Sequence, residues 1–183
     1  MGWRRDFGVT HRTMAEAFHA GLNRGNANYI LVERVYEQRD YAGLSYIEYS
    51  LWGNVIARRI APEDLPNHIA WAIEKGVNAR EELEFSFAGW MTDTTMRHLN
   101  ALGVRAETVV ENEYGPRGGI KAGRRVALLN GRAVNTNEFY GLRRLAAMPA
   151  WKQPEMPAWA VRASAARRVA YALQAGQQEL SFA

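Results

Sequence analysis

Residues 44–60 are Leu-Ser-Tyr-Ile-Glu-Tyr-Ser-Leu-Trp-Gly-Asn-Val-Ile-Ala-Arg-Arg-Ile. Two runs rich in β-formers, 44–51 and 55–60, flank the turn sequence Trp52-Gly53-Asn54. Strand formers on both sides of a short turn that contains glycine predict an antiparallel β-hairpin.

Further strands are predicted on both sides of it. Residues 28–36 and 104–110 are rich in β-formers, and residues 124–129 and 132–134 flank Asn130-Gly131, the pair that suits a type I′ turn. Residues 82–87 alternate strictly between apolar and polar, which is typical of a half-buried strand. The alternation predicts that three side chains face inward, namely Leu83, Phe85 and Phe87. It predicts that the other three face outward, namely Glu82, Glu84 and Ser86.

Helices are predicted where apolar residues recur at helical spacing and capping residues stand at the ends. These segments are residues 10–22, 62–75, 92–102, 135–147 and 158–175, the last ended by Gly176. Three prolines in residues 148–157 exclude helix and central strand there. We therefore expect an α+β fold: a mostly antiparallel sheet with helices on one face, and a C-terminal helix after a proline-rich linker. The expected divisions are a domain at 1–147, the linker at 148–157, and a helix with its tail at 158–183.

Composition excludes several classes of protein. The chain has 183 residues, of which 48% are hydrophobic and 23% charged, so it is globular rather than disordered. It has no cysteine and only 4 histidines, and we expect neither a metal site nor a cofactor. No apolar run is long enough to span a membrane and no signal peptide opens the chain, so we expect a soluble protein that stays in the cytoplasm and contacts no membrane.

Charge is divided unevenly along the chain. Residues 1–113 hold 12 basic and 16 acidic side chains, whereas residues 114–183 hold 11 basic and 3 acidic ones. This asymmetry indicates an acidic partner, either nucleic acid or an acidic protein surface, unless the two parts pair with each other in the fold or in a homo-oligomer. The candidate contact residues are Arg117, Lys121, Arg124, Arg125, Arg132, Arg143, Arg144, Arg162, Arg167 and Arg168.

Two further groups of residues have both a functional and a structural interpretation. Thr94, Thr95, Arg97 and His98 open a predicted helix, where they could hold an anion or simply cap the helix. Five aromatic residues could stack on bases, but we expect most of them to fill a small β-core or its rim: Tyr46, Tyr49, Trp52, Trp90 and Tyr140. No nucleophile, base or carboxylate pair is placed by local spacing, so no catalytic residue is predicted.

Three stretches together resemble a family of small proteins encoded by phages and plasmids. They are residues 11–18 with the Gly25-Asn26 pair, residues 44–57, which are rich in Tyr and Ser, and residues 93–102, which begin Asp-Thr-Thr-Met-Arg-His. The resemblance covers about residues 10–102. That family has no settled activity, so the resemblance implies an origin in a mobile element and a place in the host cytoplasm rather than a reaction.

These observations predict a binding protein that is not an enzyme. We expect its basic C-terminal part to contact nucleic acid or an acidic host protein complex. Two alternatives remain: an anti-defence inhibitor that occludes or dismantles a host complex, as anti-CRISPR proteins do, and a virion or scaffold component.

Overall fold

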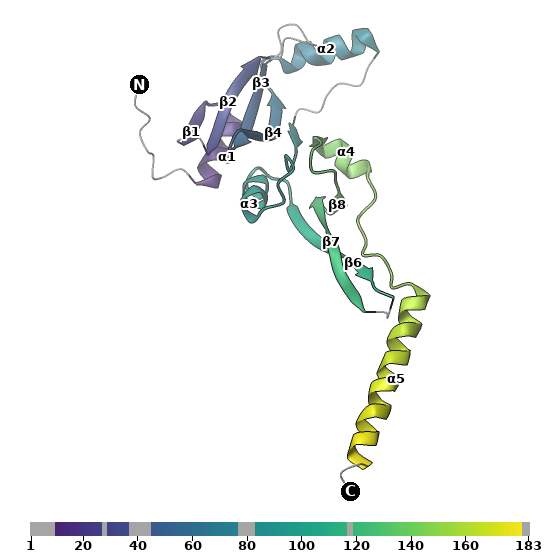
Figure 1. The fold of residues 1–183 in the computed structure, drawn as a ribbon. Coiled ribbons are helices and arrows are strands. Elements are labelled where there is room, and N and C mark those ends of the chain that lie inside the picture. Colours follow the sequence, from purple (N-terminus) through teal and green to yellow (C-terminus); the bar gives the residue numbers. More distant parts are fainter. Residues whose placement is uncertain (1–9, 27–28, 37–44, 77–82, 117–118, 181–183) are drawn as a thin grey trace. The chain divides into compact units, whose positions relative to one another are not determined.

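The computed structural model of the chain describes residues 10–26, 29–36, 45–76, 83–116 and 119–180 (Figure 1). Side chains of residues 26, 122 and 172–180 are outside this description. The chain divides into two compact units. Unit 1 comprises residues 1–108 and 127–151, and unit 2 comprises residues 109–126 and 152–183.

Unit 1 is built on a six-stranded sheet in the order β1-β2-β3-β4-β5-β9, in which all neighbours are antiparallel. Its strands are β1 Arg24–Asn26, β2 Ile30–Tyr36, β3 Ser45–Leu51, β4 Asn54–Ile60, β5 Leu83–Phe85 and β9 Tyr140–Gly141. β3 and β4 are the hairpin that the sequence predicts. The predicted α+β class with mostly antiparallel strands is confirmed.

One row of side chains crosses five strands of this sheet at neighbouring register positions. The row runs Val32, Tyr49, Ala57, Phe85 and Tyr140, and each residue is at most 4% exposed. Side chains opposite one another on antiparallel strands pack directly, so this row is the centre of the core.

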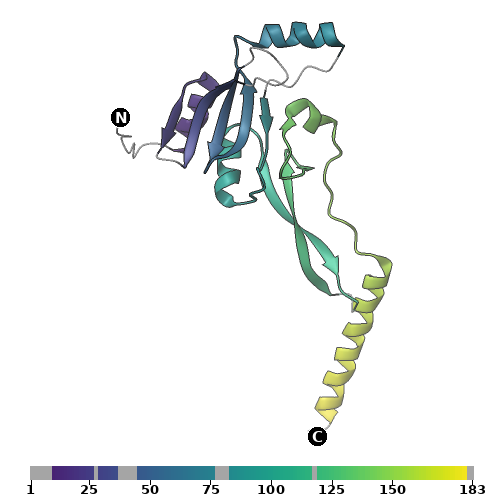
Figure 2. The ribbon, with the colours of Figure 1, turned by 45° about the horizontal axis from the view of Figure 1, so that its top comes forward.

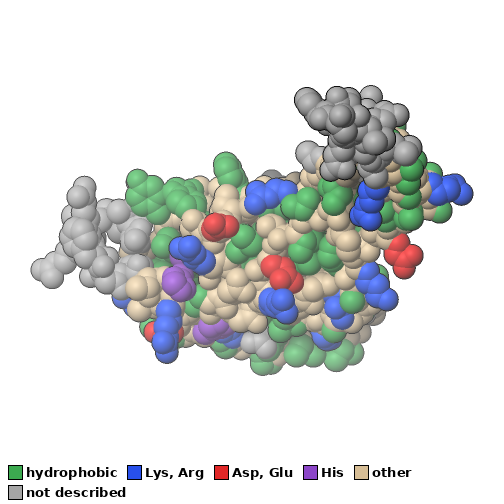
Figure 3. Space-filling view, turned by 90° about the horizontal axis from the view of Figure 1, so that it is seen from below, with side chains coloured by type: hydrophobic (Ala, Val, Ile, Leu, Met, Phe, Trp, Pro, Cys, Tyr) green, Lys and Arg blue, Asp and Glu red, His purple; other side chains and the backbone are tan. Residues whose placement is uncertain are grey.

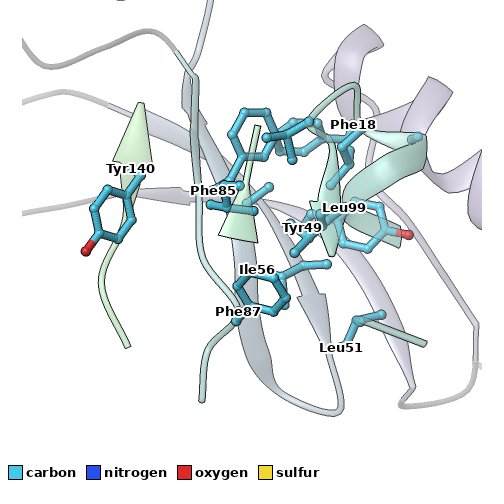
Figure 4. Close-up of a cluster of buried hydrophobic side chains, with 14 of the residues drawn as sticks. Phe18, Tyr49, Leu51, Ile56, Phe85, Phe87, Leu99 and Tyr140 are labelled. Atoms are coloured by element: carbon cyan, nitrogen blue, oxygen red, sulfur yellow. The ribbon is translucent and has the colours of Figure 1, made fainter. Parts of the chain in front are cut away.

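Two helices contribute to the same core. α1 (His11–Ala20) contributes Met14 and Phe18, and α3 (Asp93–Ala101) contributes Leu99. Figure 4 shows Phe18, Leu99 and Tyr49 gathered together, with Phe85 beside them. Both helices belong to unit 1, and α1 contacts β2, β3 and α3.

The β3–β4 pairing contains a β-bulge. Tyr49 faces Ala57 and Ser50 faces Val55, so Ile56 has no partner on β3. An extra residue of this kind turns its side chain and increases the local twist. Ile56 is 1% exposed and joins the core beside Phe87.

A second sheet has the order β6-β7-β8. Its strands are β6 Ala106–Tyr114, β7 Ile120–Leu129 and β8 Arg132–Ala133, and Figure 2 shows how β6 and β7 twist about each other. β7 and β8 meet at Asn130-Gly131, where φ is 48° and 73°, as predicted for a type I′ turn. The remaining helices are α2 Leu65–Lys75, α4 Leu142–Ala147 and α5 Ala158–Leu180. No helix in the described ranges is long and apolar enough to cross a membrane.

Two predicted helices differ most from the structure in their bounds. The predicted helix at 135–147 begins only at Leu142, because Asn135 accepts the backbone N–H of Asn137 at 3.1 Å and Tyr140 pairs with β5. The helix predicted to end before Gly176 continues to Leu180. A glycine inside a helix costs about 1 kcal/mol, which is not enough to stop it.

The alternation predicted for residues 82–87 holds in part. Phe85 and Phe87 are fully buried as predicted, and Glu82 lies outside the described residues. Ser86 was predicted to face outward, and this is wrong because it is 2% exposed. Its hydroxyl donates to the Thr136 carbonyl at 3.2 Å and accepts from the Ala88 N–H at 3.0 Å. A buried hydroxyl with both bonds made is tolerated in a core.

We predict that Phe85→Ala lowers the free energy of unfolding by about 3–5 kcal/mol, because it removes a fully buried ring from the centre of the row. Urea unfolding monitored by circular dichroism measures the loss. The matched control is Ile73→Ala on α2, where the side chain is 76% exposed and the change should stay within about 0.5 kcal/mol. Equal losses for the two variants would contradict this account of the core.

Candidate functional site

Unit 1 contains a mostly apolar pocket of about 310 Å³. Its walls come from the end of the β3–β4 hairpin, the segment after β5 and the first turn of α3. The lining residues are Leu51, Trp52, Asn54, Ile56, Phe87, Trp90, Thr92, Thr94 and Thr95. The bulge contributes to this pocket, because Ile56 is the unpaired residue of β4. We refer to it below as the tryptophan pocket.

Two tight turns present the tryptophans. At Trp52-Gly53 the φ angles are 47° and 76°, and at Ala88-Gly89, directly before Trp90, they are 49° and 80°. The Trp90 N–H closes the second turn by donating to the Phe87 carbonyl at 2.8 Å. A left-handed backbone costs most residues about 1–2 kcal/mol, and Asn or Gly normally stands there. Trp52 is therefore in a conformation that its side chain does not favour.

The indole rings of both tryptophans are accessible. Trp52 is 54% exposed and Trp90 is 58% exposed, so these two rings lie outside the core. The other three aromatics are each at most 4% exposed, which fits the expectation that most of the five belong to the core or its rim: Tyr46, Tyr49 and Tyr140. Tyr29 extends the aromatic surface: its ring meets the Trp52 ring edge to face at 6.2 Å, and its carbonyl accepts the Trp52 N–H at 2.7 Å.

Polar groups stand at one side of the pocket. Thr92 caps α3 by accepting the Thr95 N–H at 3.2 Å, and the two threonine hydroxyls are 3.0 Å apart. The exposed Thr94 hydroxyl makes no hydrogen bond within the described residues. The Asn54 amide donates to the Leu51 and Trp52 carbonyls at 3.4 and 3.2 Å, and this leaves its side-chain oxygen as an acceptor.

The four residues of the predicted anion site divide between different surroundings. Thr94 and Thr95 line the tryptophan pocket, while Arg97 is exposed. His98 is 6% exposed and faces the core. The helix predicted at 92–102 is α3, and Thr92 is its N-cap. The anion site stays a prediction.

His98 is bonded to the central tyrosine of the core. The Tyr49 hydroxyl and His98 Nδ1 are 2.5 Å apart, and the His11 ring meets the His98 ring edge to face at 6.0 Å. Burial, together with the neighbouring His11, lowers the pKa of His98 to about 4, and burial raises the pKa of Tyr49. At neutral pH both side chains are uncharged, so the pair is a satisfied polar contact inside the core.

The predicted basic residues lie in both units. Arg132, Arg143 and Arg144 belong to unit 1, and Arg117 lies outside the described residues. The others belong to unit 2 and are Lys121, Arg124, Arg125, Arg162, Arg167 and Arg168. On the face seen in Figure 3, Lys and Arg side chains are interspersed with hydrophobic ones. That these residues contact nucleic acid or an acidic protein surface stays a prediction.

Some of these cations are already paired. Arg124 bonds Glu111 at 2.7 Å, which raises the pKa of the guanidinium. Arg144 bonds Glu138 at 3.0 Å and lies 4.2 Å from the centre of the Tyr140 ring. In contrast, four exposed cations make no ion pair with any described residue: Lys121, Arg125, Arg162 and Arg168.

Sequence reasoning did not single out Asn54, Phe87 or Tyr29 as site residues. The available signal was Trp52-Gly53, since a bulky aromatic precedes glycine at a hairpin turn. No group of three His, Asp or Glu that could hold a metal ion occurs among the residues that the structure describes. Comparison with known proteins found no matching family model, no similar curated protein and no similar solved structure. The phage or plasmid origin therefore stays a prediction.

The Tyr49–His98 pair predicts a pH dependence of stability. The pKa of His98 is about 4 in the folded protein and near 6.5 when unfolded, so the unfolded chain binds the extra proton between these values. The contribution of the neutral, buried His98 to the free energy of unfolding is fully present above pH 6.5. It is lost progressively as the pH falls from 6.5 toward 4. We expect His98 to account for about 1–2 kcal/mol of the decline between pH 7 and pH 5.

Unfolding in urea at pH 7 and pH 5 measures this decline for the wild type and for His98→Asn, which can hydrogen-bond but does not titrate in this range. The variant should lose less stability than the wild type on acidification, since the remaining histidines are common to both. The same decline in both proteins would show that His98 is not buried as a neutral group.

We predict that Trp52→Asn changes the free energy of unfolding by no more than about 1 kcal/mol. Asn tolerates the left-handed backbone, as Asn130 does in the β7–β8 turn, and this relief offsets the packing that the half-exposed indole provides. Thermal unfolding measures the change. A decrease of about 3–5 kcal/mol, as expected for a buried Trp, would mean that the indole serves the core.

Proposed function

We propose that the protein binds nucleic acid and that unit 2 supplies the contact with the phosphate backbone. The observation that carries this proposal is a set of four exposed cations that form no ion pair with any described residue: Lys121 and Arg125 on β7, and Arg162 and Arg168 on α5. Unit 2 contains 8 Lys and Arg residues against 4 Asp and Glu, whereas unit 1 contains 15 of each. The net charge of the chain therefore comes from unit 2.

The pairing state of these cations matters for binding. An arginine beside a carboxylate, as Arg124 is beside Glu111, meets a phosphate with its charge already partly neutralised. Lys121, Arg125, Arg162 and Arg168 have no such bond among the described residues. Contact with phosphates then releases counterions from the nucleic acid, which is the main source of sequence-independent affinity. The presence of such cations, without an ion pair to any described residue, on both a strand and a helix of unit 2 supports a role in binding phosphates.

Aromatic side chains accompany the cations on α5. Trp159 is 45% exposed and Tyr171 is 61% exposed, and the Arg167 guanidinium lies 5.8 Å from the centre of the Tyr171 ring. Exposed aromatics among cations are typical of surfaces that bind single strands, because bases stack on the rings while the phosphates meet the cations. An acidic protein surface could pair with the cations, but it has no bases to stack on the exposed aromatic rings.

The test is the salt dependence of binding to labelled single strands and duplexes of about 20 nucleotides, measured by fluorescence anisotropy. The variants Lys121→Glu/Arg125→Glu and Arg162→Glu/Arg168→Glu should bind all sequences more weakly. Their plots of log affinity against log salt should also be shallower, by about 0.7–0.9 for each phosphate that the variant no longer neutralises. The control Arg12→Glu/Lys75→Glu makes the same change of net charge in unit 1 and should keep the wild-type slope.

Equal effects of the three double variants would mean that only net charge matters, and would contradict a contact site in unit 2. Absence of salt-sensitive binding by the wild type would exclude nucleic acid as the partner. If the charge reversals then abolish a nuclease-resistant complex with an acidic protein, the same surface serves protein recognition instead.

A further inference from the structure

We infer that the tryptophan pocket of unit 1 binds one unpaired nucleobase. This inference deepens the proposed function, on which it rests for the source of the base. The residues that line the pocket are distinct from the cations of unit 2. The base can belong to a single strand or to a free nucleotide, since the ring to be recognised is the same.

The size of the pocket suits one flat ring system. Its volume of about 310 Å³ is at the small end of the range for ligand pockets, which is roughly 300–1,000 Å³. Trp52, Trp90 and Phe87 provide aromatic surface, and Leu51 and Ile56 add aliphatic surface. Stacking on such rings stabilises a base whatever its identity, because every base has an aromatic face.

Among the described residues, the lining of the pocket contains no charged side chain. A phosphate or carboxylate group placed there would lose its hydration without an ionic partner, and this is costly. The part of the ligand that enters must therefore be neutral. A nucleobase is neutral at physiological pH, and its phosphate can stay outside the pocket in water.

Polar groups of the lining distinguish a base from a plain hydrocarbon ring. The Thr94 hydroxyl can donate and accept, and the Asn54 side-chain oxygen can accept. The edge of a base carries N–H donors beside carbonyl or ring-nitrogen acceptors, so it can use both kinds of group. The ring of a Phe side chain from a protein partner would leave these groups without bonds.

The backbone at Trp52 supports a role for its ring outside the core. Of the three described turns with two consecutive positive φ angles, the β7–β8 turn has Asn130 at the first position, as turn chemistry favours, whereas the hairpin turn has Trp52. A residue held in a disfavoured conformation with its side chain half exposed is a common mark of a functional site.

The experiment compares dT and dA single strands of about 12 nucleotides, their duplex, and the mononucleotides TMP and dAMP, with anisotropy and tryptophan fluorescence as readouts. The pocket variants are Trp90→Ala, Trp52→Asn and Thr94→Ala, and Trp71→Ala on α2 is the control for removal of an indole outside the pocket. Circular dichroism melts establish that each variant is folded under the assay conditions.

For each pocket tryptophan removed, we expect single-strand affinity to fall roughly 5- to 150-fold, the range for removal of one base–aromatic stack. Thr94→Ala should instead change the preference between dT and dA. The salt slope and the affinity for the duplex should stay at wild-type values, because the phosphate contacts are intact. Trp71→Ala should behave as the wild type.

Failure of this inference can be distinguished from failure of the proposed function. If nucleic acid binds with a steep salt slope but the tryptophan variants bind single strands as the wild type does, the pocket inference is overturned and the phosphate contact stands. If no oligonucleotide binds but TMP or dAMP quenches wild-type fluorescence and not that of Trp90→Ala, the pocket stands without the phosphate contact.

Two further outcomes would overturn the inference. In the first, neither oligonucleotides nor mononucleotides bind. In the second, N-acetyltyrosinamide, a neutral mimic of an aromatic protein side chain, saturates the quenching at concentrations where the nucleotides have no effect. The second outcome would assign the pocket to a protein partner.

Discussion

The structure of unit 1 depends on the burial of Tyr49 in the middle of the sheet. Its ring lies between Val32 and Ala57 in the cross-strand row and meets Phe18 of α1 edge to face at 6.0 Å. A tyrosine can be fully buried only if its hydroxyl has a partner, because an unsatisfied polar group in a core costs about 1–3 kcal/mol. His98 is that partner, so one hydrogen bond joins α3 to β3. The position of α3 in turn brings the threonines of its first turn to the tryptophan pocket.

The tryptophan pocket is formed where regular strand pairing stops. The bulge turns Ile56 inward, the hairpin turn presents Trp52, and the turn at Ala88-Gly89 presents Trp90. A β-carbon on Gly89 would lie 2.9 Å from Asn137 Oδ1, and its φ of 80° disfavours any side chain. These local departures from a flat sheet are features that proteins commonly use to aim side chains beside binding sites. A regular hairpin with Asn-Gly at its turn would keep the core but would present no indole.

The two proposals assign different physical tasks to the two units. Unit 2 carries the excess of positive charge and the four exposed cations, so its contribution to binding is long-range, sensitive to salt and indifferent to sequence. The tryptophan pocket of unit 1 has no charged side chain in its described lining, so its contribution is short-range stacking and hydrogen bonding, which salt screens little. Salt and substitution therefore separate the two contributions experimentally, whatever the arrangement of the units.

Local sequence signals determined the class of fold and most of its elements. The hairpin at 44–60, the Asn130-Gly131 turn and the burial of Phe85 follow from β-propensity, turn chemistry and alternation, which act between near neighbours. The basic excess of residues 114–183 was likewise present in the sequence. Tertiary structure decided the rest. His98 looked like part of an exposed helix start, but the distant Tyr49 takes it into the core. Sequence did not separate Trp52 and Trp90 from the aromatics of the core, yet a bulge and two left-handed turns bring them together at an open pocket. Sequence spacing could not predict that meeting, because it depends on the register of β3 against β4 and on the packing of α3, and both are contacts between residues far apart in the chain.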